Sequence, residues 1–364
     1  MGEPGLDVAI LGAGPVGSAL ALALRGSGLR IALIGRSREP RQPAPAALHA
    51  TRPIALSYAS RLILERIGAW EGLATTSIEQ IHVSQAGAFG RTRIGCEDLG
   101  LPALGYVAGY DAIAAHLAGR VEEDVRREDE TAAASARLIV HADGNAGPDA
   151  TAKDYGHSAI VTVVESERPA THTAWERFTR EGPLALLPLR NAYGVVWSRT
   201  FAAAAASMDA NDAQFLAALQ DAFGLRAGRF HSLGPRASIP LALRYSAGPP
   251  RAGELRIGNA AQTLHPVAGQ GLNLGLRDAW TLARMLQEAP AGAAGSADLA
   301  RAFHRARRLD VRATIRATDL LATLYVRRDP LVSVLRGAAL TALDIFPPAR
   351  TAFARRMIYG ASAW

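Results

Sequence analysis

Cysteine and lysine are almost missing from this sequence of 364 residues, since each occurs once, as Cys96 and Lys153. A single cysteine excludes an internal disulfide framework and suits a reducing compartment. Long apolar runs are also missing: none approaches the roughly 18 residues of a membrane-spanning helix, and no signal-peptide pattern is visible. We therefore expect a globular protein in the cytoplasm.

Because lysine is so rare, the net charge of +7 comes from arginine. No nucleic-acid-binding module is recognisable, and aromatic residues do not interleave with the basic ones, so we expect no nucleic-acid partner. The arginines gather late, in residues 301–356, which favours a peripheral contact with an anionic surface, that of the inner membrane. Solvated faces of helices that pack amphipathically on the domain explain the same arginines equally well.

The opening of the chain predicts a strand, a helix and a second strand, over residues 7–11, 18–27 and 29–34. Between the first strand and the helix, Gly12, Gly14 and Gly17 match the pattern G-x-G-x-x-G. Gly12 permits a tight turn, Gly14 lets the backbone approach a pyrophosphate, and Gly17 lets helix and strand pack closely. Pro15 suits a first helical turn, where a phosphate would also be stabilised. We predict a dinucleotide site here.

The end of the second strand departs from the usual dinucleotide-binding pattern. A carboxylate about 20 residues after the glycine motif normally binds the adenosine ribose. Here Ile34 is followed by Gly35, Arg36 and Ser37, with no acid before Glu39. We expect Arg36 to contact a phosphate and Ser37 a ribose hydroxyl instead.

Later segments alternate between helix and strand. We expect helices over 57–67, 110–118 and 210–223, strands over 81–86, 91–94 and 137–141, and a loop over 145–153. Apolar runs over 158–164, 184–187 and 193–197 predict a largely antiparallel sheet. Residues 299–360 are expected to be mostly helical, with breaks at Pro330 and Pro347.

The most informative stretch is a glycine-rich loop at the start of residues 258–279, which follows a strand-like run over 255–257 and leads into a helical pattern. Its four glycines and one proline keep side chains out of the way, so that backbone N–H groups can approach a large flat ligand. Together with the first glycine motif, this loop indicates a flavin. Asp278 would suit the first turn of the following helix.

Along most of its length the chain resembles the FAD-dependent aromatic hydroxylases of ubiquinone biosynthesis. The resemblance is carried by residues 52–57, 64–70, 81–84, 104–107, 176–178, 182–188, 308–310 and 318–320. The run 258–278 is the most specific segment, and Asn259, where many related flavoproteins have Asp, is typical of this branch.

This resemblance implies an α/β fold: a Rossmann-like FAD-binding domain of the glutathione-reductase type, an inserted, mainly antiparallel β substrate domain, and C-terminal helices. We assign residues 1–80, 104–155 and 251–290 to the FAD-binding domain, 81–103 and 156–250 to the substrate domain, and 298–364 to the helical region.

The resemblance also implies the site residues. FAD would be held, beyond the first glycine motif, by Arg52, Asp143, Gly144, Gly258, Asn259, Gly269, Gln270, Gly271, Leu272 and Asn273. Asp143 and Gly144 match a motif near FAD and NAD(P)H, although an ordinary strand-end turn reads the same way. His265 and Pro266 would lie beside the flavin with no proton transfer assigned, and a loop histidine that donates to the backbone explains His265 equally well.

The activity that the resemblance implies is hydroxylation of a phenol ring. NAD(P)H would reduce FAD, O₂ would add at C4a, and the hydroperoxyflavin would pass its distal oxygen to the ring. We expect the substrate pocket between the glycine-rich loop and the sheet of residues 158–197, where apolar walls suit a prenylated phenol. A quinone-synthesis complex is an expected partner.

Two further departures keep other interpretations open. The motif Asp143-Gly144 is not followed by the family's Ser and Arg, and residues 117–137 are too short for the strands that cover the adenosine side. One alternative is a hydroxylase of a soluble aromatic substrate. The other is a catalytically degenerate family member that serves as a binding or scaffold subunit.

Overall fold

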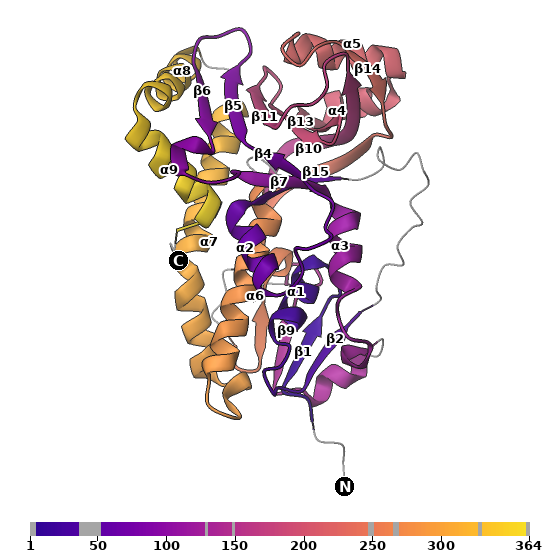
Figure 1. The fold of residues 1–364 in the computed structure, drawn as a ribbon, viewed down its shortest axis with the longest axis vertical. Helices are drawn as coiled ribbons and strands as arrows, with labels where there is room; N and C mark the ends of the chain where they lie inside the picture. Colours follow the sequence, from indigo (N-terminus) through magenta and orange to yellow (C-terminus); the bar gives the residue numbers. More distant parts are fainter. Residues whose placement is uncertain are drawn as a thin grey trace.

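A parallel sheet forms one end of the molecule (Figure 1). The computed structural model describes residues 5–35, 52–127, 130–147, 150–246, 251–264, 269–326 and 330–361. The sheet has the order β16 (Glu254–Arg256), β9 (Leu138–His141), β1 (Val8–Leu11), β2 (Ile31–Ile34) and β8 (Arg126–Arg127). All four neighbouring pairs are parallel. The carboxyl ends of these strands therefore share one edge of the sheet.

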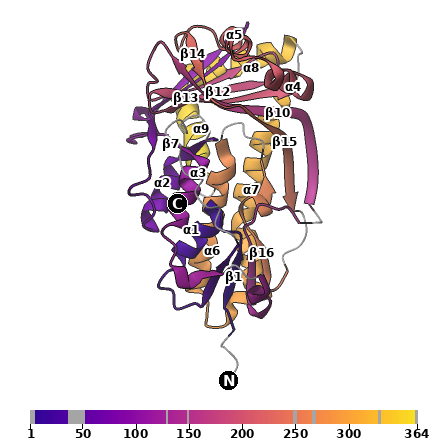
Figure 2. The same cartoon turned by 90° about the vertical axis from the view of Figure 1, so that its right-hand side faces the viewer.

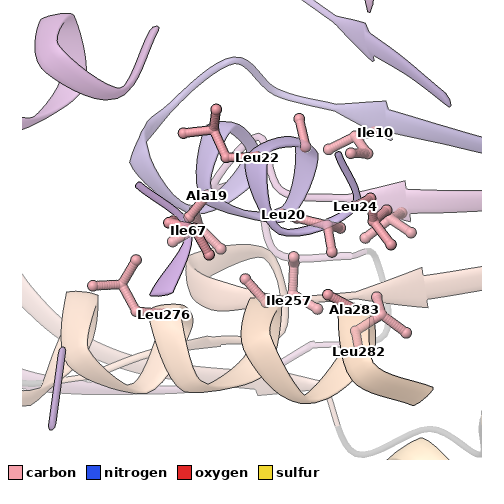
Figure 3. Packing of buried hydrophobic residues seen from close by; sticks show 14 of the residues in the cluster. Ile10, Ala19, Leu20, Leu22, Leu24, Ile67, Ile257, Leu276, Leu282 and Ala283 are labelled. Atoms are coloured by element: carbon pink, nitrogen blue, oxygen red, sulfur yellow. The ribbon is translucent and has the colours of Figure 1, made fainter. Parts of the chain in front are cut away.

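Two helices, α1 (Pro15–Ala23) and α6 (Gln270–Glu288), pack together against this sheet. Figure 3 shows their apolar side chains meeting beside Ile257. A Cβ built at Gly17 would lie 2.0 Å from the carbonyl oxygen of Gly12, so only glycine permits this helix to approach the turn. The prediction that the first helix spans 18–27 is wrong at both ends, because Pro15 starts the helix and it ends at Ala23.

The second sheet lies at the opposite end of the molecule (Figure 2). Its order is β17 (Gln262–Thr263), β15 (Ala237–Ser246), β10 (Ala150–Ser166), β13 (Ala192–Thr200), β12 (Pro183–Leu189), β11 (Thr173–Phe178), β5 (Gln80–Gln85) and β6 (Arg91–Gly95), with β14 (Phe230–Leu233) beside β10. The β11–β5 pair is parallel and the others are antiparallel. The largely antiparallel sheet is confirmed.

The 17-residue strand β10 corrects one expectation. Residues 150–153 were expected in a loop, but they pair with residues 243–246 of β15. This end of the strand could not be recognised from the sequence, because it is largely exposed and carries no apolar run. The same strand is continuous across residues 155 and 156, where we had drawn the boundary between FAD-binding and substrate domains.

Helices α4 (Phe201–Asp209) and α5 (Asp212–Phe223) cover the outer face of the second sheet, where Ala204 of α4 and the aromatic side chains of α5 pack against Trp197 and its neighbours. Only α5 was predicted. Between the two large sheets lies a small one, β3 (Pro53–Ser57), β7 (Gly105–Gly109) and β4 (Thr76–Ile78), with α2 (Tyr58–Arg66) and α3 (Tyr110–Ala118) beside it.

The C-terminal region is helical, as predicted, over α7 (Ala297–Val326), α8 (Pro330–Ile345) and α9 (Pro347–Tyr359). Prolines begin the last two helices, where a missing N–H costs little. Within the described residues, no single helix is long and apolar enough to cross a membrane, although α8 and α9, bent by 101°, pass that test as a pair.

Candidate functional site

A cavity of about 720 Å³ lies between the two large sheets. Its lower wall consists of the loops at the carboxyl ends of the parallel strands, and its upper wall is the inner face of the second sheet. The volume falls in the range of cofactor and small-molecule pockets. The expected position of the pocket, between the glycine-rich loop and residues 158–197, agrees with this lining.

Three strand ends bring distant predicted residues together on the lower wall. Gly12 and Gly14 follow β1, Asp143 and Gly144 follow β9, and Asn259 follows β16. A Cβ at Gly144 would be 3.9 Å from that of Asn259, so the two loops face each other. This is where open parallel sheets bind ligands.

The N-termini of α1 and α6 both open onto the cavity. Their N-cap residues, Gly14 and Gly269, provide no side-chain hydrogen bond, so the first N–H groups of each helix have no side-chain cap. A Cβ at Gly14 would meet nothing closer than the Tyr110 hydroxyl at 3.9 Å, and one at Gly271 would meet nothing within 4 Å. The wall is thus bare where a ligand would approach, and two helix dipoles favour an anion there. These residues fit the pyrophosphate and ring of FAD.

The Asp143 carboxylate is held by its own turn. It accepts hydrogen bonds from the backbone N–H and the side-chain amide of Asn145, at 3.2 and 2.8 Å. Asn145 stands where the family usually has Ser, and it closes the turn locally. The same geometry matches an ordinary strand-end turn, but this one lies on the cavity wall.

Four predicted cofactor residues lie behind the wall: Gly17, Gly258, Gln270 and Asn273. The Asn273 amide donates to the carbonyls of Ala55 and Gly269, and its oxygen accepts from the Ser57 backbone and the Ser60 hydroxyl. Its side chain therefore fixes the loop from behind instead of facing the cavity. Besides the five residues at the strand ends, the predicted residues on the wall are Pro15, Arg52, Gly269, Gly271 and Leu272, with Arg52 exposed at one side. His265, Pro266 and Arg36 lie outside the described residues.

A buried ionic network supports the loop. Asp278, which was expected in a first helical turn, lies in the third turn of α6 and accepts from the Gly258 N–H at 3.0 Å and from Arg307 at 2.7 Å. Arg307 and Arg277 both bind Asp310, at 2.9 and 2.8 Å. Burial raises the pKa of Asp310, but the charges of Arg277 and Arg307 outweigh it and leave that pKa below its usual value. The network joins α6 to α7.

The segment between α3 and β9, which we expected to cover the adenosine side of the cofactor, is short. Between α3 and β9 the described residues form only two short 3₁₀ segments and the two-residue strand β8, which extends the parallel sheet beside β2. Ala133 of the second 3₁₀ segment packs on Ala9, Ala32 and Ile34. Gly35 lines the cavity at this end.

The upper wall is apolar apart from one residue. Alternate residues of its strands face the cavity, including Ala174, Glu176, Ala185, Leu187 and Val196. Glu176 is the charged side chain in a row that runs across the sheet through Val83, Glu176, Ala185, Val196 and Val161. Burial raises the pKa of Glu176 to about 7.

Sequence reasoning missed several residues of the cavity wall. Tyr110, Gly35 and Leu264 line it, and Glu176 was noted only as part of a resembling segment. The available signal was the acidic residue two positions after Ala174 in a β-rich segment, but β11 was not predicted as a strand. Among the described residues, no group of His, Cys, Asp and Glu could hold a metal ion.

Comparison with known proteins agrees with this geometry. The family model of the FAD binding domain matches residues 111–318, more than half of the chain. The chain is 30% identical over 381 residues to ubiquinone hydroxylase UbiL of Rhodospirillum rubrum, across 96% of this chain and 88% of that protein. It is 31% identical to 3-demethoxyubiquinol 3-hydroxylase of Escherichia coli, across 78% of this chain and 80% of that protein.

The fold and the cavity therefore define a flavin-dependent monooxygenase. The chain belongs to the FAD-binding-domain family of hydroxylases that includes these ubiquinone hydroxylases. Its fold resembles p-nitrophenol 4-monooxygenase PnpA of Pseudomonas putida (TM-score 0.73, 15% identity, 98% of this chain and 99% of that one). It also resembles HpxO of Klebsiella pneumoniae in complex with FAD (TM-score 0.75, 14% identity, 97% and 98%). At these identities the likeness shows the fold alone.

Proposed function

We propose that this protein hydroxylates a prenylated phenol in ubiquinone biosynthesis, with FAD as cofactor, NAD(P)H as reductant and O₂ as co-substrate. The observation that carries the proposal is the division of one cavity into a bare backbone wall and an apolar side-chain wall. Relatives that are ubiquinone hydroxylases support the choice of substrate class. When bound, FAD supplies the redox chemistry that takes electrons from NAD(P)H and activates O₂.

The residues of the chain bind and orient the reactants. The N-termini of α1 and α6 favour the negative charge of the pyrophosphate and of the reduced ring. Leu187, Val196 and their neighbours would exclude water from the upper part of the cavity, and they would hold a substrate ring by apolar contact. Because the fold gives nicotinamide no dedicated domain, NAD(P)H would enter the same cavity.

Flavin absorbance and turnover test this function together. Protein reconstituted with FAD should bind one flavin per chain, and 2-prenylphenol should accelerate NAD(P)H oxidation and yield a hydroxylated ring. Faster turnover of short soluble phenols than of prenylated ones would favour the soluble-substrate alternative. A colourless protein after reconstitution would favour the scaffold subunit.

We further propose that α8 contacts an anionic membrane surface. Its exposed residues Leu331, Val334, Leu335 and Ile345, each more than half exposed, follow helical spacing on one face. Its charged residues are turned inward instead: Arg336 binds Gln85 of β5, and the Asp344 carboxylate accepts from the Arg93 N–H. Figure 1 shows α8 beside β5 and β6 at the edge of the molecule.

The occupant we propose for this face is lipid, because the outward face of α8 is apolar and α9 adds the exposed Arg355 and Arg356 nearby. Vesicles of phosphatidylglycerol and phosphatidylcholine should pull down the wild type, and Leu331→Glu/Leu335→Glu should lose this binding. Leu225→Glu is the control, because Leu225 is also an exposed apolar residue but does not belong to α8. Vesicle binding unchanged in the double variant, or a face that proves to be a protein interface of a quinone-synthesis complex, would contradict the proposal.

A further inference from the structure

We propose that Glu176 is the proton acceptor for the substrate's phenol hydroxyl, and that the chain therefore selects phenols over their ethers. This inference rests on the proposed function for the identity of the substrate ring. The direction of the Glu176 side chain is the first observation that supports it. In β11 the neighbours Trp175 and Arg177 face α5, where Trp175 packs on Phe223 and Arg177 donates to the Ala222 carbonyl. Since side chains alternate along a strand, Glu176 faces the cavity.

The surroundings of Glu176 provide no partner for a carboxylate. Its cross-strand neighbours are Val83 of β5 and Ala185 of β12, and no hydrogen bond or ion pair within the described chain reaches it. Glu176 is half-buried on the cavity wall, and an unpaired carboxylate withdrawn from bulk water costs free energy, so its place in an apolar wall points to a ligand that donates a hydrogen bond to it. A phenol O–H is such a donor.

The groups that could compete for this carboxyl lie elsewhere. Among the described residues of the cavity wall, the other titratable side chains are Arg52, Tyr110 and Asp143. Arg52 and Asp143 are exposed, on the lower and lateral walls, whereas the cavity-facing residues of β10, β12, β13 and β15 are aliphatic or proline. His82 lies on the outer face of the sheet, where its ring packs at a tilt against Trp175. Burial alone accounts for the raised pKa of about 7.

The chemistry follows from this position. The phenol O–H bond breaks, the proton forms a new O–H bond on Glu176, and the electron pair stays on the phenol oxygen and delocalises into the ring. The ring thereby gains electron density at its ortho and para positions, where an electrophilic oxygen atom derived from O₂ is accepted. The ring carbon that gained the oxygen then loses its hydrogen as a proton to water, which restores the aromatic ring, and Glu176 returns its own proton to the phenol oxygen. A pKa near the operating pH suits a group that takes and returns a proton.

Kinetics provide the first test. In the wild type, kcat/KM for 2-prenylphenol should rise as the pH rises through about 7, because the carboxylate form accepts the proton. Glu176→Gln should lower kcat by about 10²- to 10⁴-fold and abolish the rise of kcat/KM with pH. Glu176→Asp should retain part of the kcat that Glu176→Gln loses, together with the rise of kcat/KM with pH. Glu79→Gln, at an exposed residue of the same region, is the matched control. An unchanged kcat and pH profile in Glu176→Gln would overturn the proposal.

Equilibrium binding separates this proposal from the proposed function. By calorimetry, the wild type should bind 2-prenylphenol about tenfold or more tightly than its methyl ether well above pH 7, and less selectively well below it. Glu176→Gln should show no such change of selectivity with pH. If the wild type shows this pattern without hydroxylating the phenol, the proposed function fails and the role of Glu176 as acceptor stands. Equal binding of phenol and ether by the wild type would contradict that role even if hydroxylation occurs.

Discussion

The two walls of the cavity are built in opposite ways. The lower wall is backbone: glycines at strand ends and uncapped helix N-termini leave N–H groups facing the ligand. The upper wall is side chain: aliphatic residues from neighbouring strands, with one carboxyl among them. The first wall suits a cofactor that is the same across a family, and the second suits a substrate that differs. Specificity should therefore respond to changes in the upper wall and cofactor affinity to changes in the lower one.

The largest effect is expected directly behind the lower wall, where Gly17 of α1 leaves no space for a side chain. Gly17→Val would place side-chain atoms against the Gly12 carbonyl, where even a Cβ would lie at 2.0 Å. We expect a loss of about 4 kcal/mol or more in the free energy of unfolding, through separation of α1 from the sheet. Urea denaturation of the purified protein measures it. A stable Gly17→Val protein that still binds FAD would show that the close approach is not required.

A second large effect is expected behind the same wall. Asp278→Asn leaves Arg307 without one of its buried carboxylate partners and weakens the hold on the Gly258 N–H. We expect a cost of about 3–5 kcal/mol in unfolding free energy. Asp298→Asn, which breaks an exposed pair with Arg301, should cost less than about 1 kcal/mol. Equal losses of unfolding free energy in the two variants would show that the buried network stabilises the fold no more than an exposed ion pair does.

Gly14→Val separates cofactor binding from stability. Gly14 has extended backbone angles that valine can adopt, and the space beside it opens to the cavity. We expect FAD affinity to fall by about 100-fold, or about 2.8 kcal/mol, while the thermal midpoint of the FAD-free protein changes little. Fluorescence titration with FAD and a melting curve without it provide the two measurements. Unchanged FAD affinity would mean that the ligand does not approach this turn.

The buried network also predicts a loss of stability in acid. Because Arg277 and Arg307 hold the pKa of Asp310 below its usual 3.8, the ionised form stabilises the fold at higher pH. That contribution is complete above pH 3.8 and is lost as the pH falls through the lowered pKa, by up to about 1.4 kcal/mol per pH unit. The urea midpoint measured against pH should fall in this window, and less so in Asp310→Asn.

The smallest effect is expected in the upper wall. Ala185 lies opposite Glu176 on β12, and Ala185→Leu would fill part of the substrate space. We expect KM for 2-prenylphenol to rise by about tenfold, with FAD affinity unchanged. Steady-state kinetics beside a flavin titration check both. A fall in FAD affinity with no change in KM would show that the upper wall binds the cofactor and not the substrate.

The same contrast explains what could be predicted from the sequence. The lower wall depends on local patterns, such as the spacing of Gly12, Gly14 and Gly17, and the structure brings most of the predicted residues onto that wall. Gln270 and Asn273 lie behind it, since helix phase decides which face of α6 turns to the cavity. The upper wall depends on the register of β11 with β12, which follows it in the chain, and with β5, which is distant in sequence. Because β11 was not predicted as a strand, Glu176 could not be placed on that wall from the sequence.

One spectrum tests the central claim most directly, namely that FAD and a phenol share this cavity on its two walls. Protein reconstituted with FAD should show the flavin absorbance of one cofactor per chain, and 2-prenylphenol should shift that absorbance on binding. Ala185→Leu should weaken the phenol's effect without loss of flavin. Absence of bound flavin after reconstitution, or a flavin spectrum that the phenol leaves unchanged at saturation, would contradict the account.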